Sequence, residues 1–291
     1  MAGYIEKKKI KGKTYYYLTE NKRVGASWKK TRKYLGVHTA AGFEKPRKTK
    51  PKQILSEHEL NLVEKIKTAY ASKHKIGKNL WNEERDRLVS FIYNTNSIEG
   101  NPLTEEETNS VLLGKKVKAR EKDVREVENM KRCVDFLFSF KGEMDEKFLL
   151  KLHAMEMGGI MPDAGTYRAV DVRVGNYICP SWEEVPVLMR RFFEWYESVK
   201  SSMHVFELAS LVHLKFVRVH PFRDGNGRIA RLIMNFILLK NGYPLLNIFN
   251  SEKMLYYLVL QEVDAKKRHG PFVKYLYGVF GKQYKEYLLR Q

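Results

Sequence analysis

Apolar residues recur at helical spacing along most of the chain. Near residue 60, Leu60, Val63 and Ile66 follow one another at intervals of three. Residues spaced by three and four lie on the same face of a helix, so this pattern predicts an amphipathic helix with one buried face. The same spacing predicts further helices, which are expected over 81–99, 143–157, 205–217 and 272–289 and around Val185 and Trp195.

The first 37 residues show a different pattern. Aromatic and β-branched residues form short clusters at 4–5, 15–18 and 33–35, separated by glycine or polar residues. Such clusters favour strands, and the simplest arrangement is a small antiparallel sheet of three short strands. Residues 38–52 have two prolines and no periodicity, which predicts a linker.

One further stretch breaks the helical pattern. Val170, Val172 and Val174 alternate with other residues and lead into Gly175–Asn176, after which Tyr177–Ile178 follow. Alternation on both sides of a turn of this type predicts a β-hairpin. The chain is therefore expected to be mainly α-helical, with strands confined to its first 37 residues and to this hairpin.

The net charge of +19 is unevenly distributed along the 291 residues. Residues 1–52 hold 16 Lys and Arg against three acidic residues, a balance of +13, while the remaining 239 residues hold 37 against 31. Basic side chains interleaved with aromatic ones are typical of surfaces that bind nucleic acid. Two alternatives remain open for residues 1–52: docking to a protein, or a solvated basic surface that keeps the sheet edges from associating.

Some classes of protein are excluded by composition. No run of about 18 apolar residues occurs and the N-terminus has no apolar signal region, so no membrane association and a cytoplasmic location are expected. Two cysteines, Cys133 and Cys179, fit neither a disulfide framework nor a zinc site, and both are expected to be buried thiols.

Residues 220–231, HPFRDGNGRIAR, concentrate candidate chemistry in twelve positions. The apolar run that follows has helical spacing and stops at Asn241–Gly242, so the Gly225–Gly227 turn is expected to open a helix. A glycine turn at a helix N-terminus suits an anion, because backbone N–H groups converge there. Arg228 and Arg231 could bind two phosphates of one chain.

Two more residues of this stretch have chemistry of their own. Asp224 offers a hard oxygen ligand for Mg²⁺ shared with phosphates. His220 is the group that can take up a proton near neutral pH, which makes it the candidate general base. The stretch has no Gly-Lys-Ser/Thr, so it is not a P-loop.

The stretch resembles the Fic-family signature HPFx(D/E)GNGRxxR at every specified position. The resemblance implies a Fic-type helical bundle that transfers AMP from ATP, with Mg²⁺, to a Ser, Thr or Tyr hydroxyl of a protein, including the chain itself. It implies that His220 is the base and Asp224 the metal ligand. It further implies a nucleotide site whose residues are Gly225, Asn226, Gly227, Arg228 and Arg231, with Asn235 at the adenine pocket.

A second motif resembles the inhibitory segment (S/T)xxxE(G/N) of Fic proteins that inhibit themselves. Thr95, Glu99 and Gly100 match its specified positions. The resemblance implies that Glu99 pairs with Arg231 where the γ-phosphate would lie, so that inhibition acts in cis. Without it, residues 94–104 would be only a helix end, a turn and a cap, with Thr104 and Glu107 placed for a capping box.

The hairpin also acquires a role from the resemblance. It corresponds to the flap that holds the target segment beside the base, for which Val172, Val174, Tyr177 and Ile178 are the candidates. Tyr256 and Tyr257 are candidates for the adenine edge or for packing. His213 is expected to pack in the core, and His153 is expected to be packed or on the surface rather than catalytic.

The expected organisation is a small basic β-sheet domain (1–37), a linker (38–52), an N-terminal helical part with the inhibitory segment 95–100 (53–141) and a catalytic core (142–291). The core would contain the flap (170–180) and the signature loop (220–231). Two alternatives to AMP transfer remain: removal of AMP at the same site, and a nucleic-acid-binding regulator that uses the Fic body as a sensor. The sequence leaves monomer and dimer open.

Overall fold

The computed structural model describes residues 4–10, 13–24, 27–38, 52–73, 84–175, 177–266 and 269–288. The chain separates into two compact units, Met1–Lys45 and Pro46–Gln291. Most of the predicted linker, residues 39–51, lies outside the described residues, as does Trp81 at the expected start of the second helix.

The first unit is a three-stranded antiparallel sheet with the order β1 (Tyr4–Ile10), β2 (Lys13–Val24) and β3 (Ser27–His38). The register pairs Glu6 with Tyr17 and Tyr17 with Tyr34, and a bulge interrupts the β2–β3 ladder between Tyr16 and Tyr17. The expected sheet is confirmed, but its strands are longer than the aromatic clusters that marked them. The strands pair through backbone groups, which lysine and threonine supply just as aromatic residues do, so the aromatic clusters mark only part of each strand.

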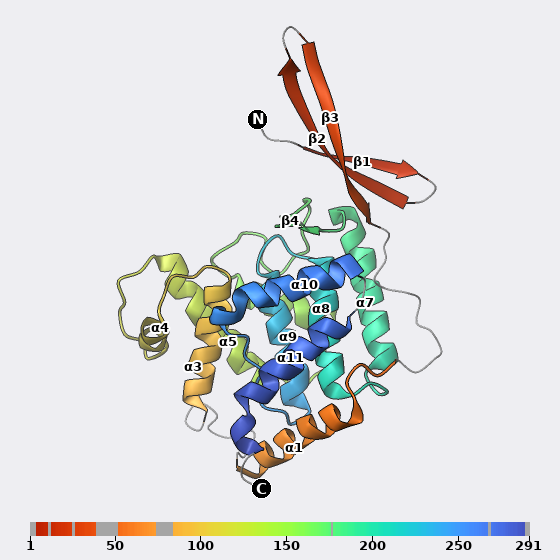
Figure 1. Cartoon of the computed structure of the whole chain (residues 1–291). Coiled ribbons are helices and arrows are strands. Elements are labelled where there is room, and N and C mark those ends of the chain that lie inside the picture. The colour runs from red at the N-terminus through yellow and green to blue at the C-terminus, as the bar shows by residue number, and fades with distance from the viewer. Residues whose placement is uncertain are drawn as a thin grey trace. The chain divides into compact units, whose positions relative to one another are not determined.

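The second unit is helical (Figure 1). Its helices are α1 (Glu57–Lys73), α3 (Arg85–Ile98), α4 (Glu105–Leu112), α5 (Glu121–Ser139), α6 (Glu146–Glu156), α7 (Val185–Val199), α8 (Val205–Val219), α9 (Asn226–Lys240), α10 (Lys253–Lys266) and α11 (Gly270–Gln283). Short 3-10 turns cover Trp182–Glu184, Asn250–Glu252 and Lys285–Tyr287. The hairpin consists of β4 (Arg173–Val174) and β5 (Tyr177–Ile178).

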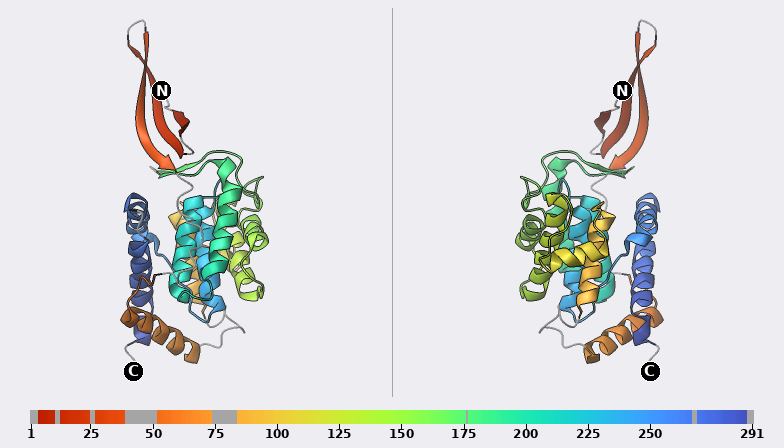
Figure 2. Two further views of the ribbon diagram at one scale, coloured as in Figure 1. Left: turned by 90° about the vertical axis from the view of Figure 1, so that its right-hand side faces the viewer. Right: turned by 90° about the vertical axis from the view of Figure 1, so that its left-hand side faces the viewer.

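Helix α9 lies at the centre of this unit. Its residues from Arg228 to Leu238 are all buried, which a surface helix with one apolar stripe would not allow. Figure 2 shows α10 and α11 on one side of α8 and α9, with α5 and α6 on the other. The N-terminal end of α9 is therefore surrounded by protein, and the residues that reach it come from α3, α5 and α6 as well as from the loop before it.

Local signals explain several element boundaries. Thr104 and Glu107 form the predicted capping box at the start of α4. Helix α9 ends as predicted before Asn241, and Gly242 adopts the left-handed conformation (φ 80°) that glycine tolerates best. Helix α11 is shorter than predicted, because it ends at Gln283 and a 3-10 turn follows.

The hairpin is also shorter than its sequence pattern. Val170 and Val172 precede β4 and belong to no strand, so the alternation overestimated the strand. In this stretch the carbonyl of Val170 accepts a hydrogen bond from the side chain of Arg168 at 2.8 Å. Cys133 and Cys179 are buried and form no disulfide, as expected. Among the described residues, no helix is both long and apolar enough to cross a membrane.

Candidate active site

The loop between α8 and α9 is closed by the side chains of its own residues. Asn226 accepts a hydrogen bond from the N–H of Phe222 (2.9 Å) and donates one to the carbonyl of Phe222 (2.8 Å). The ring of Phe222 is fully buried and stacks on His153 at 3.7 Å. His153 donates from Nε2 to the carbonyl of Asp224 (3.2 Å), since its Nδ1 accepts from Gly165 N–H (2.8 Å). These contacts hold the backbone of residues 222–226 in one conformation.

His220 caps α8 in an unusual backbone conformation. It has φ 51° and ψ 58°, the left-handed region, and among the described residues no other non-glycine residue has a positive φ. A side chain in this region is strained by about 1–2 kcal/mol, so the surrounding contacts must hold it there.

The imidazole of His220 is neutral near pH 7. Burial lowers its pKa to about 4, against the hydrogen bond to the carbonyl of Val217 and with help from the charge of Arg168. The Val217 carbonyl can only accept, so Nδ1, at 3.3 Å, carries the proton. Nε2 then has a free lone pair and can accept a proton from a substrate.

The N-terminus of α9 already holds a carboxylate. A Cβ on Gly227 would overlap Oε1 of Glu99, so this oxygen lies directly against the first turn of the helix. The first N–H groups of a helix have no acceptor within the helix, and its dipole favours negative charge there. Glu99 therefore occupies an anion site, and Gly227 leaves the room for it. Gly225, in the left-handed conformation (φ 78°), makes the turn into the helix.

Arg231 binds the same carboxylate. Its NH2 donates to Oε1 of Glu99 at 2.8 Å and to the carbonyl of Thr95 at 2.9 Å, and its Nε donates to the Thr95 hydroxyl at 2.7 Å. Only 1% of the Arg231 side chain is exposed, against 27% of Glu99. Burial by itself would lower the pKa of Arg231, but the charge of Glu99 offsets this and raises it. The predicted contact between Glu99 and Arg231 is thus present, and Gly100 continues the turn with φ 95°.

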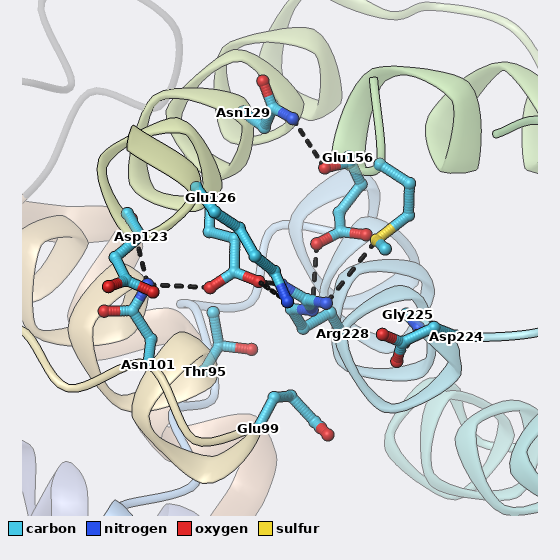
Figure 3. Close-up of polar contacts among 12 residues, drawn as sticks. Thr95, Glu99, Asn101, Asp123, Glu126, Asn129, Glu156, Asp224, Gly225 and Arg228 are labelled. Carbon is cyan, nitrogen blue, oxygen red and sulfur yellow. Dashed lines mark hydrogen bonds and ion pairs between the residues drawn. The ribbon is translucent and has the colours of Figure 1, made fainter. Parts of the chain in front are cut away.

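Arg228 lies between two buried carboxylates (Figure 3). Its Nε is 2.9 Å from Oε1 of Glu156, and its NH1 is 3.3 Å from Oε1 of Glu126. Burial raises the pKa of Glu156 to about 7, although the positive charge of Arg228 opposes the shift. With 2% of its side chain exposed, Arg228 is already neutralised by protein, so phosphate would have to share it with these carboxylates.

The chain segment that carries Glu99 also reaches Arg228. Asn101, two residues after Glu99, donates to Oε2 of Glu126 (2.8 Å) and to the carbonyl of Asp123 (3.0 Å). Glu126 in turn contacts Arg228. The end of α3 is therefore linked to both arginines, directly to Arg231 through Glu99 and indirectly to Arg228 through Asn101 and Glu126. Figure 3 shows the second of these links.

Asp224, the candidate Mg²⁺ ligand, lies in the loop directly before α9. Its exposed carboxylate accepts a hydrogen bond from Gly225 N–H at 2.7 Å, which fixes its direction beside the start of α9. Among the described residues, no group of three or more His, Cys, Asp and Glu could hold a metal alone. Mg²⁺ in nucleotide sites is often bound by one or two carboxylates together with phosphates, and Asp224 fits that mode.

The predicted hairpin residues differ in exposure. Val174 is 43% exposed and Val172 partly so, whereas Ile178 is buried. Tyr177 donates from its hydroxyl to the carbonyl of Arg218 at 2.9 Å, near the end of α8. Strand β4, with the exposed Val174, is open to a partner, while Tyr177 and Ile178 of β5 attach the hairpin to the protein.

Asn235, predicted at the adenine pocket, is fully buried among protein groups. Its amide donates to the carbonyls of Arg231 (3.0 Å) and Leu246 (2.9 Å) and accepts from the N–H of Leu246 (2.7 Å). These bonds fasten the segment after α9 and leave the amide no evident capacity for a base. His213 and Tyr256, 3.0 Å apart through Nε2 and the hydroxyl, are packed in the core, as expected for His213.

Several residues of the site were not identified from the sequence. They are Asn101, Glu126, Glu156 and Arg168. His153 is packed, as expected, and its ring also supports the loop before α9. Glu156 is separated from Arg228 by 72 positions and no motif connects them, so periodicity gives no signal for the pair. The sequence shows Glu156 only as an acid at the end of an apolar helix, and its burial is evident from the structure alone.

Known proteins resemble this chain both in the signature loop and over most of its length. The model of the Fic/DOC family matches residues 143–238. The protein adenylyltransferase Fic of Drosophila willistoni is 30% identical over 250 residues, which cover 82% of this chain and 49% of that protein. The same-named protein of Culex quinquefasciatus is 30% identical over 247 residues, with 82% and 49% coverage. The chain thus spans about half the length of these curated relatives.

Two solved structures have the same fold as this chain. A Fic domain containing signaling protein from Bacteroides thetaiotaomicron superposes with a TM-score of 0.69 at 27% identity, covering 78% of this chain and 96% of that one. A Fic family protein from Desulfovibrio desulfuricans has a TM-score of 0.68 at 25% identity. With its signature loop, its helical body and these relatives, the chain is a member of the Fic/DOC family.

Proposed function

We propose that this protein is a protein adenylyltransferase that transfers AMP from ATP to the hydroxyl of a protein side chain. The hydroxyl oxygen attacks the α-phosphorus, the bond from that phosphorus to the bridging oxygen breaks, and pyrophosphate leaves. The hydroxyl proton passes to Nε2 of His220. The observation that carries the proposal is the neutral imidazole of His220 beside an anion site at the N-terminus of α9.

The anion site supports binding of the triphosphate. Glu99 shows that a negative charge is accepted between Gly227 and Arg231, and a phosphate offers the same charge in the same place. Positioning and preorganised charge supply most of the catalysis in transfer at phosphorus. Asp224 would hold Mg²⁺, which supplies positive charge to the departing pyrophosphate.

We further propose that Glu99 inhibits the enzyme in cis. The Glu99 carboxylate and the γ-phosphate would compete for one guanidinium, that of Arg231, so ATP would bind in a productive pose only after Glu99 moves away. Thr95 contributes by holding Arg231 through two hydrogen bonds from the same helix.

The hairpin supports the choice of a protein as acceptor. Strands β4 and β5 form a two-stranded sheet, and β4, whose Val174 is exposed, pairs with no other strand among the described residues, so an extended target segment can add to it by backbone hydrogen bonds. Such pairing reads little target sequence, so the chain's own hydroxyl-bearing residues are included among the acceptors.

Intact-mass analysis of Glu99→Gly after exposure to each nucleoside triphosphate tests this proposal. The expected result is a mass increase of one AMP with ATP and Mg²⁺, with little change in the wild type and none in Glu99→Gly combined with His220→Ala. The absence of any adduct on Glu99→Gly and on added proteins would contradict AMP transfer.

Removal of AMP by the same site is the second candidate. The partly exposed carboxylate of Glu99 lies at the anion site, where it could orient a water molecule towards an AMP-modified side chain. Incubation of an AMP-modified protein with the wild type and with Glu99→Ala separates the two activities: removal requires Glu99, whereas addition increases without it.

For the N-terminal unit we propose nucleic-acid binding. The charge of +13 over residues 1–52 and the three-stranded sheet support it. The affinity for duplex DNA should fall with salt in proportion to the phosphates contacted, and the replacement of Lys7, Lys8 and Lys9 by Glu in the full chain should reduce that slope. An unchanged slope would favour the other roles of this unit.

A further inference from the structure

Arg168 is a buried cation whose side chain binds three main-chain carbonyls. Its Nε donates to His220 (2.7 Å), its NH1 to Val170 (2.8 Å) and its NH2 to Pro180 (2.6 Å). Its own N–H donates to the carbonyl of Pro221 at 2.9 Å. Only 2% of the residue is exposed.

The bonded carbonyls lie in two structural elements. Val170 and Pro180 flank the hairpin, one before β4 and one after β5. His220 and Pro221 begin the signature loop. One side chain therefore fixes the two ends of the hairpin to each other and to the residue that carries the base. A planar guanidinium with donors in fixed directions suits this better than a lysine, which has one flexible nitrogen.

The contact with His220 acts on a strained residue. With φ at 51°, His220 keeps its conformation only if its neighbours hold it, and the direction of its carbonyl is set by φ and ψ together. The Nε of Arg168 binds that carbonyl, and the N–H of Arg168 binds the next one along the chain. The two bonds hold two successive peptide groups, the one that joins His220 to Pro221 and the one that joins Pro221 to Phe222.

The charge of Arg168 acts on the same residue. It disfavours the imidazolium of His220, whereas Asp224 and Glu99 favour it, and burial, the largest cause, keeps the imidazole neutral. Arg168 therefore contributes both to the place of the base and to its readiness to accept a proton.

We propose that Arg168 is a positioning residue that fixes the hairpin and the His220 backbone as one unit, so that an acceptor hydroxyl held on the hairpin meets the imidazole. The inference rests on the proposed AMP transfer and adds to it a specific link between target binding and the base. A misplacement of about 1 Å at such a site can cost on the order of a hundredfold in rate.

The test uses the full chain carrying Glu99→Gly, to which Arg168→Lys or Arg168→Gln is added. Arg191→Gln, which removes an exposed arginine from α7, is the matched control. The rate of self-labelling is measured against ATP concentration. We expect both Arg168 variants to lower the maximal rate by about tenfold or more, while the ATP concentration that gives half the maximal rate stays within about twofold of the control.

A second readout does not depend on activity. Nuclear magnetic resonance of ¹⁵N-histidine-labelled protein follows the charge of the His220 ring with pH, its signal being assigned with His220→Ala. Loss of the positive charge in Arg168→Gln should raise the pKa of His220, whereas Arg168→Lys, which keeps a charge, should leave it close to that of the parent. If Arg168→Gln does not fold, as judged by circular dichroism, Arg168→Lys decides the matter through the labelling rate.

The outcomes are distinct from those of the proposed function. If the parent Glu99→Gly transfers no AMP, the proposed function fails and the histidine titration still tests the effect of Arg168 on the base. If the parent labels itself and both Arg168 variants do so at the control rate, with the His220 pKa unchanged, Arg168 has no positioning role. Equal losses of rate and of ATP affinity would also overturn the inference, since they indicate a general disturbance of the fold.

Discussion

The replacement of Glu99 by alanine should strengthen ATP binding and weaken the nucleotide-free protein at the same time. Glu99 neutralises Arg231, of which 1% is exposed, and binds it at 2.8 Å. Without Glu99 the guanidinium is a buried charge that keeps its two bonds to Thr95. A triphosphate can then supply the missing negative charge, so binding and stability change in opposite directions.

The size of the effect follows from the burial of the pair. Removal of one partner from a buried ion pair costs about 3–5 kcal/mol. Because 27% of Glu99 is exposed and Thr95 remains, about 2 kcal/mol is a better figure for this site. If ATP recovers that amount, its dissociation constant falls by a factor of about 30. The nucleotide-free variant should melt about 4–8 °C below the wild type.

Isothermal titration calorimetry with a non-hydrolysable ATP analogue and Mg²⁺ measures the affinity, and differential scanning calorimetry measures the melting temperature. Glu99→Gln, which keeps the shape and loses the charge, should give an intermediate affinity. Glu106→Ala, at an exposed acid in α4, is the control for a change of net charge. An affinity in Glu99→Ala equal to that of the control would refute competition at Arg231, whatever the change in stability.

Three further predictions concern the loop and its supports. Burial raises the pKa of Glu156 to about 7, above its unfolded value of 4.5, so the contribution of Glu156 to stability is complete below about pH 4.5 and is lost as the pH rises through about 7. Urea denaturation should show that the wild type loses up to about 3 kcal/mol of unfolding free energy over this range relative to Glu156→Gln. Gly227→Ala should lower the melting temperature of the wild type, because its Cβ would overlap Oε1 of Glu99, but should lower it little in a Glu99→Ala background. Equal losses of melting temperature in the two backgrounds would contradict this overlap. Asn226→Ala removes two buried hydrogen bonds to Phe222 and should cost about 2–3 kcal/mol in the unfolding free energy, and a loss under about 0.5 kcal/mol would contradict its role in closing the loop.

The sequence predicted the parts of the site that are continuous in the chain. The helix boundaries around the signature loop, the capping box at Thr104 and the end of α9 depend on contacts between neighbouring residues, which a sequence displays directly. The contact between Glu99 and Arg231 was predicted as well, although 132 positions separate them, because the resemblance to a family supplied it.

The rest of the site depends on contacts that no local rule describes. Arg168 binds His220 across 52 positions, and Glu156 meets Arg228 only because α6 and α9 pack together. Periodicity places Glu156 on α6 but does not tell which helix that face contacts. The hairpin was overestimated because alternating valines do not show which backbone groups pair, and the carbonyl of Val170 binds the side chain of Arg168.

The end of α3 has a consequence for how the proposed inhibition could be relieved. Glu99 and Asn101 leave this helix side by side, and one holds Arg231 while the other holds the carboxylate that contacts Arg228. A point change at Glu99 frees one guanidinium, but a shift of the helix end by one turn would withdraw both supports together. An activator that binds α3 would therefore release Arg228 and Arg231, the two arginines of the proposed phosphate site, in a single movement, and the response to it should be steeper than the response to any one substitution.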